Sequence, residues 1–495
     1  MNFLSENFLL GLSILLLISL LAGSTTYRFG VPTLLLFLSV GMLAGSEGIG
    51  GIPFDDPALT RFIGIVCLNF ILFSGGLDTR WRAVKPVLWP GITLSTLGVL
   101  LTAITLALFL WQILNYSFPE SLLIGSIVSS TDAAAVFSIL RARNMALRSK
   151  LRPLLELESG SNDPMAYVLT ISSLQLLKQP ETDGLELFRL FATQMLVGGL
   201  SGYSAGHLSY RLINRVKLGY EGLYPVLVIA LMLLTFSGTE FLGGNGFLAN
   251  YLCAVVIGNR EIVHKNTVLK VFDGLAWLMQ IGLFLTLGLL VFPSHLWAVA
   301  SKGFLVASFL ILVARPVAIF SSLAFFRFDF RCRLFIAWAG LRGAVPIVFA
   351  TYPYLAGVEK ADLIFNLVFF VSVLSVVVQG TSMPLVARWL GLLQKDKEIS
   401  ENSIPAHFLP EDLPRSAIRE FELLPGHYAV KKKIMDLKIP PDIFILLIKR
   451  QGQFIRPGGS TLLQAHDRLT LLGTNKKALD EVIVKLKDGK SGSES

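Results

Sequence analysis

Residues 158–163 of the chain read Glu-Ser-Gly-Ser-Asn-Asp, and they lie inside a stretch that otherwise has the composition of a membrane-spanning helix. A second polar pair, Thr131 and Asp132, occurs one apolar segment earlier. An acidic side chain at the centre of a bilayer costs roughly 3 kcal/mol on insertion scales, so such residues usually face a water-filled path and carry function. The alternative is that these acids lie in loops between spans. Because the polar residues cluster, the sequence predicts a functional site within the membrane.

The overall composition is typical of a polytopic membrane protein. Of 495 residues, 53% are hydrophobic and only 16% are charged, which is far from the usage of a soluble domain. The net charge of +9 does not indicate nucleic acid as a partner, because basic residues of membrane proteins gather in cytoplasmic loops. Three cysteines, Cys67, Cys253 and Cys332, have no metal-ligand spacing and are expected to be packing residues.

Apolar runs long enough to cross a bilayer, roughly 17 to 25 residues each, recur up to Leu393 and number about thirteen. The first, over 8–21, has no basic residue before it and is expected to be an uncleaved span rather than a signal peptide. The runs centre near Leu16, Phe37, Ile71, Leu101, Ser126, Leu169, Gly199, Ile229, Val255, Leu283, Ile311, Ala344 and Val373.

The charges of the connecting loops predict the orientation. Lys and Arg concentrate in alternate loops, near 80–85, 141–152, 211–217, 260–265 and 327–333, and the intervening loops are acidic or nearly neutral. The positive-inside rule places the basic loops in the cytoplasm. An odd number of spans then puts the N-terminus outside and the C-terminus inside, as expected for the inner membrane of a bacterium.

Two spans are predicted to be broken. The fifth carries Ser-Ser-Thr-Asp at 129–132, and the twelfth carries Gly-Leu-Arg-Gly-Ala-Val-Pro at 340–346. In a thirteen-span count these are the fifth members of two six-span halves joined by the seventh span, and the two halves have opposite orientation. Paired interruptions at matching positions indicate a transporter site near the bilayer midplane. The fold class is therefore an all-α polytopic membrane protein with inverted repeats and two broken crossing helices.

Beyond the transmembrane domain, 1–395, the composition becomes charged and mixed. Prolines mark a linker, 396–414, and a small α+β module follows over 415–488, with a tail over 489–495 that is expected to be disordered. Within the module the patterns predict strands at 417–423, 443–448 and 468–472, helices at 429–437 and 476–486, and a turn at 458–459.

The polar residues near 158–163 can converge on one spot. Ser159 and Asp163 are four residues apart, as are Glu158 and Asn162, so on a helix each pair shares a face. A dehydrated monovalent cation needs several oxygen ligands, and Asp163, Ser159, Asp132 and carbonyls freed at Thr131 would supply them. Protons would compete with the cation for the Asp163 carboxylate. That competition is the basis of antiport.

The remaining polar groups have structural alternatives. Asn162 is expected to hydrogen-bond to the unwound region at Thr131. Arg342 is the expected counter-ion of Glu158, since an unpaired buried arginine is costly, and both can be scaffold rather than ion ligands. Asp132 can cap the second half of its broken helix or contact the ion. Two further residues are expected to be structural: Arg315, as a snorkelling residue near the end of an apolar run, and His207, the one histidine within a span.

These motifs resemble the signature of the NhaP-type branch of the monovalent cation:proton antiporters. The resemblance covers nearly all of 1–395 and implies thirteen helices in inverted repeats, a homodimer, and elevator-like alternating access by a six-helix core. It implies that Asp163 is the cation and proton site, that Ser159, Asp132 and Thr131 contribute ligands, and that Asn162, Glu158 and Arg342 stabilise the site. The related electrogenic branch has two aspartates where this chain has Asn162 and Asp163, so the resemblance implies electroneutral exchange.

The module resembles the TrkA-C domain, the C-terminal half of the domain that regulates potassium channels and transporters. The resemblance rests on an apolar strand running into Lys449-Arg450, a turn at 456–458, and Asp467 before a strand. It departs at His466, where a glycine commonly stands. No Gly-x-Gly-x-x-Gly follows a strand in the tail, so a Rossmann nucleotide site is not expected. A small regulatory nucleotide, such as a cyclic dinucleotide, at the interface of paired modules is the ligand that the resemblance allows.

The sequence thus predicts a secondary antiporter that exchanges cytoplasmic K⁺, or Na⁺, for external protons in cation and pH homeostasis, without a cofactor. Potassium is favoured because the tail resembles modules of potassium systems. A Na⁺(Li⁺)/H⁺ antiporter with the same site is the first alternative. A channel would need a selectivity filter of consecutive carbonyls, such as Thr-Val-Gly-Tyr-Gly, which the sequence lacks. A membrane enzyme would need a nucleophile or metal-ligand cluster, and no such arrangement is recognisable.

Overall fold

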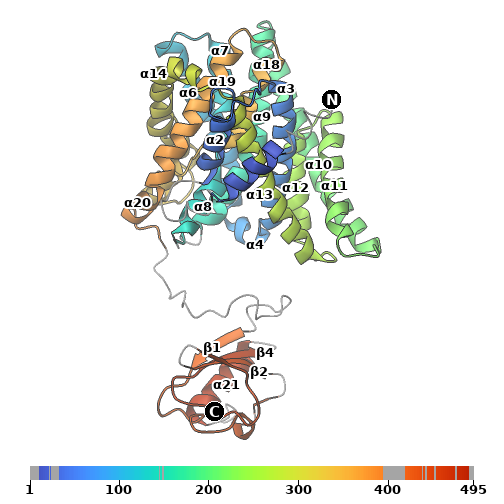
Figure 1. Ribbon diagram of the computed structural model, residues 1–495, viewed down its shortest axis with the longest axis vertical. Helices are drawn as coiled ribbons and strands as arrows, with labels where there is room; N and C mark the ends of the chain where they lie inside the picture. The colour runs from blue at the N-terminus through green and yellow to red at the C-terminus, as the bar shows by residue number, and fades with distance from the viewer. Residues whose placement is uncertain are drawn as a thin grey trace. The chain divides into compact units, whose positions relative to one another are not determined.

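The computed structural model describes residues 10–21, 23, 33–143, 145–147, 150–393, 418–437, 439–440, 443–450, 453–473 and 476–489. The chain divides into two compact units, Met1–Lys395 and Asp396–Ser495 (Figure 1). The predicted linker, 396–414, and nearly all of the predicted tail, 489–495, lie outside the described residues.

In the first unit the described residues form helices joined by loops, with one isolated β-bridge between Leu147 and Leu393. Its helices are Leu10–Leu21, α2 (Thr33–Ala44), α3 (Pro57–Asp78), α4 (Trp81–Val84), η1 (Lys85–Val87), α5 (Leu88–Thr93), η2 (Leu94–Gly98), α6 (Val99–Ile113), α7 (Phe118–Ile127), α8 (Ala133–Ala142), α9 (Leu151–Lys178), α10 (Gly184–Arg215), α11 (Leu223–Phe241), α12 (Gly246–Gly258), α13 (Lys265–Leu290), α14 (Pro293–Phe309), η3 (Leu310–Ala314), α15 (Arg315–Ser322), α16 (Phe330–Trp338), α17 (Ala344–Phe349), α18 (Tyr352–Leu355), α19 (Ala361–Ser375), η4 (Val376–Gly380) and α20 (Thr381–Trp389). The segments η2, η3 and η4 are π-helical turns within longer helices.

Among the described residues, six continuous helices are long and apolar enough to cross a membrane, and five shorter helices of 10–17 residues are also apolar. Every predicted span centre falls in a helix, so the helical membrane fold is confirmed, whereas the count of thirteen spans stays a prediction.

Capping residues in the sequence mark where several of these helices begin. Ser117 and Glu120 form a reciprocal capping box at the start of α7, and Asp56 accepts a hydrogen bond from the Leu59 amide at the start of α3.

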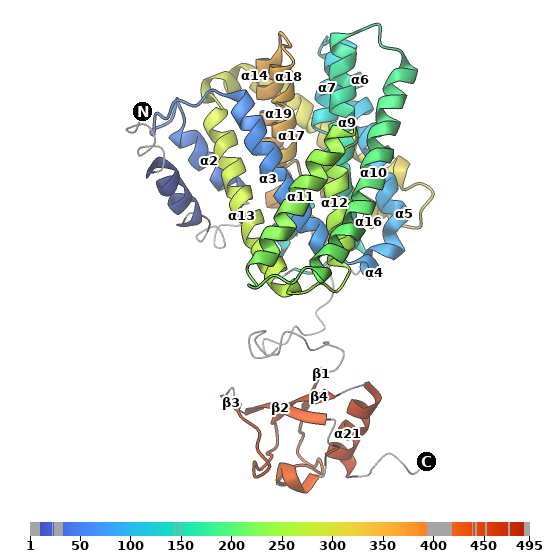
Figure 2. The same cartoon turned by 90° about the vertical axis from the view of Figure 1, so that its right-hand side faces the viewer.

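The helices α10, α11 and α12 lie side by side, and they share a buried apolar cluster with α3 and α13 (Figure 2). The packing of α10 on α12 depends on small residues. A methyl group added at Gly202 would lie 2.5 Å from the Ala249 carbonyl oxygen. The other helices, including α6, α7, α14, α17 and α19, are built around a second and larger cluster. The two clusters meet in α3, α12 and α13, each of which contributes residues to both.

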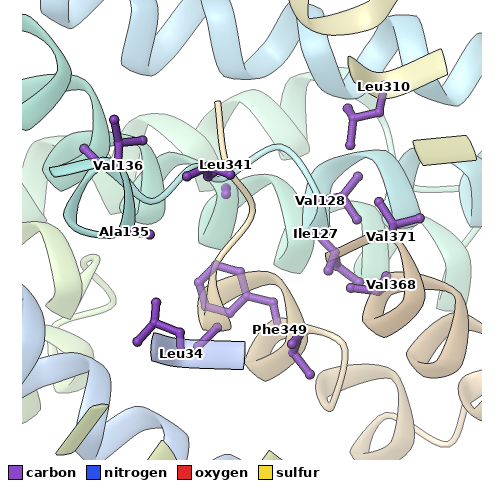
Figure 3. Packing of buried hydrophobic residues seen from close by; sticks show 14 of the residues in the cluster. Leu34, Ile127, Val128, Ala135, Val136, Leu310, Leu341, Phe349, Val368 and Val371 are labelled. Atoms are coloured by element: carbon purple, nitrogen blue, oxygen red, sulfur yellow. The ribbon is translucent and has the colours of Figure 1, made fainter. Parts of the chain in front are cut away.

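Both predicted helix breaks are confirmed. The chain leaves the helical conformation between α7 and α8 and again between α16 and α17. The two unwound segments meet: the Asp132 amide donates to the Leu341 carbonyl at 2.8 Å. Buried apolar side chains surround this crossing, including Val128, Val136 and Leu341 (Figure 3).

The second unit contains a four-stranded antiparallel sheet of order β1-β4-β2-β3, packed with α21 (Lys476–Asp488) around its own apolar core. The strands are β1 (Ile418–Glu422), β2 (Ile443–Arg450), β3 (Gln453–Ile455) and β4 (Arg468–Gly473). The three predicted strands and the final helix are confirmed, and β3 was missed because it is only three residues long.

The helix predicted over 429–437 is wrong. The chain forms turns there, followed by the 3₁₀ helix η7 (Ile434–Leu437). Lys431 adopts the left-handed conformation with φ of 66°, and its amide donates to the Leu463 carbonyl at 2.8 Å. A positive φ is incompatible with a right-handed helix, so bonding to the neighbouring segment replaces the helix.

Candidate functional site

Asp163 lies on α9 beside the crossing of the two unwound segments, and the residue is 6% exposed. The hydroxyl of Ser130, in the first break, donates a hydrogen bond to its carboxylate. Sequence reasoning missed this contact, although the polar run at 129–132 was its signal. Asp132 lies two residues after Ser130 in the same break. The structure therefore brings the two predicted acids together.

Two further side chains of α9 form hydrogen bonds to the unwound segment between α7 and α8. The Ser159 hydroxyl donates to the Thr131 carbonyl at 3.1 Å and accepts from the Ala133 amide at 3.0 Å. The Asn162 amide donates to the Thr131 hydroxyl at 2.5 Å, which confirms the hydrogen bond predicted from the sequence. The two bonds of Ser159 replace partners that the backbone loses where the helix unwinds, and the Asn162 bond holds the Thr131 side chain.

Asp132 combines a capping role with proximity to the site. Its carboxylate accepts from the Ala135 amide at 3.1 Å and so caps α8. Its other oxygen lies against Gly343 of the second break, where a methyl group would clash with the carboxylate. The capping alternative is thus confirmed. The contact of Asp132 with the ion stays a prediction.

Arg342 occupies the second break and is 1% exposed. Its guanidinium Nη1 donates to the carbonyls of Ser129 and Ser130, each at 2.6 Å. These two carbonyls face away from any intrahelical donor because the helix has ended, and a cation satisfies their partial negative charge. Arg342 therefore stabilises the unwound segment. Its Nη1 already donates hydrogen bonds to two of the carbonyls freed there.

The predicted ion pair between Glu158 and Arg342 is wrong, because Glu158 pairs with Arg315. Both partners are 1% exposed, so the expectation of a snorkelling Arg315 is also wrong. Gly340 makes room for this arginine, since a methyl group there would lie 2.6 Å from the Arg315 Nε atom. Arg315 begins α15, which packs on α16, and this packing carries the side chain to Glu158.

An aromatic cluster lies one helical turn beyond Asp163 on α9. Tyr167 lies one turn after Asp163 on α9, and its ring contacts Phe247, Phe349 and Tyr352 with centroid distances of 5.3, 5.8 and 5.9 Å. Phe247 and Phe349 are at most 2% exposed. The cluster joins α9, α12, α17 and α18 and fixes the part of α9 that follows Asp163.

Other candidate residues have structural roles. In the described parts of the chain, no group of three or more His, Cys, Asp or Glu residues could hold a metal ion. Cys67 and Cys253 are buried in packed helices, and Cys332 is half-buried. The ring of His207 bonds to the Tyr203 carbonyl one turn earlier, at 3.0 Å.

In the C-terminal unit, Asp467 is fully buried and holds Arg450 through two hydrogen bonds of 2.8 Å. This contact raises the pKa of the Arg450 guanidinium. His466, the departure from the family pattern, adopts φ of 69°, the left-handed conformation that favours glycine. The unusual residue thus keeps the backbone geometry that a glycine would provide.

Comparisons with known proteins define the class. Residues 13–389 match the family described as sodium/hydrogen exchanger, transmembrane, and residues 418–483 match the TrkA-C domain. The chain belongs to the sodium/hydrogen exchanger family and carries a C-terminal TrkA-C domain.

Its relatives include NhaP antiporters. The chain is 38% identical over 468 residues to the K⁺/H⁺ antiporter NhaP of Alkalimonas amylolytica, covering 94% of this chain and 80% of that protein. It is 39% identical over 477 residues to the K⁺/H⁺ antiporter NhaP2 of Shewanella sp. (strain ANA-3), covering 95% and 81%.

A solved structure shares the fold. The sodium proton antiporter MjNhaP1 of Methanocaldococcus jannaschii superposes with a TM-score of 0.68 at 22% identity, covering 78% of this chain and 99% of that one.

Proposed function

We propose that this protein is an electroneutral secondary antiporter that exchanges cytoplasmic K⁺ for external H⁺. The observation that carries the proposal is the buried carboxylate of Asp163 at the crossing of two broken helices, next to the amide of Asn162. A carboxylate in that setting can hold either a proton or a cation, and one binding site for both couples their movements in opposite directions.

The ligand set follows from the oxygens that remain available. The positively charged Arg342 engages the carbonyls of Ser129 and Ser130, so the Thr131 carbonyl is the oxygen of the break that contributes to the cation. It accepts one hydrogen bond from Ser159, and a carbonyl oxygen has a second lone pair for the cation. Asp163, Asp132 and Ser159 complete the set, with oxygens that monovalent cations bind. The metal at this site is the transported ion itself, and Asn162, Glu158 and Arg342 hold the surrounding structure.

Potassium is the proposed cargo because relatives at 37–39% identity are named K⁺/H⁺ antiporters. A sodium-selective exchanger with the same site is the second candidate. Its support is the more distant Na⁺/H⁺ antiporter ApNhaP of Aphanothece halophytica, at 26% identity over 412 residues. The site motifs contain the same oxygen donors in either case.

Transport would proceed by an elevator-like movement of the helix group that carries the site against the group of α3 and α10–α13. The apolar cluster that joins α10 and α11 to parts of α3, α12 and α13 supports such a division. The protein would be a homodimer in the inner membrane of a bacterium, with the N-terminus outside and the TrkA-C domain in the cytoplasm as a regulatory module. The basic loops support this orientation.

The test uses purified protein in sealed vesicles containing a pH-sensitive dye. We expect K⁺ or Na⁺ gradients to drive proton movement, with no effect of an imposed membrane potential. Asp163→Asn should abolish the exchange, because an amide neither releases a proton nor balances a cation. Asp362→Asn is the matched control, since this exposed acid bonds to the Tyr354 hydroxyl far from the site. Cation-driven proton flux in folded Asp163→Asn vesicles would overturn the assignment.

A further inference from the structure

Gln379 is a buried amide in the last span, and neither the sequence motifs nor the ligand set includes it. The residue is 1% exposed and lies in the π-helical turn η4. Its Nε2 donates to the Trp338 carbonyl at 2.9 Å, and its Oε1 accepts from the Ser375 hydroxyl at 2.5 Å. A buried amide in an apolar span is costly unless its groups are bonded, and π-turns frequently mark functional positions.

The partners of this amide identify what it does. In a continuous helix the Arg342 amide would donate to the Trp338 carbonyl four residues earlier. The second break separates these two groups. The Trp338 carbonyl instead accepts from Gln379, and the Arg342 amide donates to the Ser375 hydroxyl at 3.1 Å. Ser375 and Gln379 thus replace both halves of one missing backbone hydrogen bond, and they bond to each other across one helical turn.

The hydrogen bonds of Ser375 and Gln379 are connected to the ion site through Arg342. The backbone of Arg342 is held by Ser375, and its guanidinium donates to the carbonyls of Ser129 and Ser130. The Ser130 hydroxyl in turn donates to the Asp163 carboxylate. Hydrogen bonds therefore connect Gln379 to Asp163 through three intermediate residues, Ser375, Arg342 and Ser130.

We infer that Ser375 and Gln379 are positioning residues of the transport site, and that they tune cation affinity by fixing Arg342 over the unwound segment. The inference rests on the proposed antiport function. If the pair is removed, the second break gains freedom to move, Arg342 shifts on the Ser129 and Ser130 carbonyls, and the Asp163 carboxylate loses its fixed orientation. The cation then loses part of its preorganised ligand set.

The test compares variants in the vesicle assay with the full chain. Gln379→Met keeps a similar side-chain volume and removes both hydrogen bonds, and Ser375→Ala removes the acceptor of the Arg342 amide. We expect each to raise the apparent KM for the cation about five- to tenfold, the change that loss of one net hydrogen bond produces in an equilibrium constant. Because both act through Arg342, the double variant should show no more than the larger single effect.

Ser382→Ala is the matched control. The Ser382 hydroxyl accepts from the Trp338 indole at 3.0 Å and donates to the backbone carbonyl of Gln379 at 3.3 Å, so it joins the same two spans. Within the described residues it makes no hydrogen bond to the Gln379 side chain, to Ser375 or to Arg342. We expect this variant to keep the cation KM of the original chain. A melt in detergent identifies any variant that fails to fold, and Ser375→Ala, the smaller change, then carries the test.

The outcomes separate the inference from the proposed function. If the unaltered protein exchanges no cation for protons, the proposed function is wrong. If it does exchange, the inference is overturned when the Gln379 and Ser375 variants keep the original KM. It is also overturned when their effects equal that of Ser382→Ala, or when the two effects simply add.

Discussion

Removing one member of the buried pair formed by Glu158 and Arg315 should destabilise the protein strongly. Both residues are 1% exposed and are held by a direct ion pair, so Glu158→Gln or Arg315→Gln leaves one charge without its counter-ion. Breaking a buried pair in this way costs about 3 to 5 kcal/mol. The double variant buries two neutral amides and should recover about 2 kcal/mol or more of the summed loss, which is the coupling energy of contacting residues.

Unfolding in mixed detergent micelles provides the free energies for this double-mutant cycle. The control is the same cycle between Glu158 and Arg342, the pair expected from the sequence. The Arg342 guanidinium bonds to backbone carbonyls rather than to Glu158, so this second cycle should show a much smaller coupling. Equal coupling in both cycles, or strict additivity between Glu158 and Arg315, would refute the assigned pairing.

Three further results are expected. Asn162→Asp adds an acid and removes the donor to the Thr131 hydroxyl, so exchange should become sensitive to an imposed membrane potential; unchanged insensitivity in vesicles would contradict the role of the amide in electroneutrality. A chain ending at Lys395 should still exchange ions but respond differently to pH or cytoplasmic potassium. If its pH profile, ion response and mass in detergent all stay the same, the regulatory role fails. Asp467→Asn should lower the unfolding free energy of the separately expressed C-terminal unit by about 2 to 3 kcal/mol, because it breaks a buried charged hydrogen bond; urea unfolding measures this, and the exposed Asp480→Asn should have little effect.

Much of the fold was predictable because a bilayer imposes strong local constraints on composition. Each predicted span centre lies in a helix, and both breaks occur where glycine, proline or charge interrupts an apolar run. The hydrogen bond from Asn162 to Thr131 was predictable for the same reason, since an unwound segment inside a membrane must find donors and acceptors nearby. The error at 429–437 arose in the small soluble unit, where a left-handed residue ended a helix-like pattern.

The sequence by itself therefore determined the class of protein, the positions of the two breaks and the acids that meet there, because burying a charge or an unpaired backbone group in a membrane is costly wherever it occurs. Only the tertiary structure decided which arginine pairs with Glu158, that Ser130 bonds to Asp163, and that Gln379 caps Trp338. These contacts join segments up to 157 residues apart. Apolar spans have similar compositions, and the faces that meet are selected by side-chain packing across the whole bundle, which no local pattern encodes.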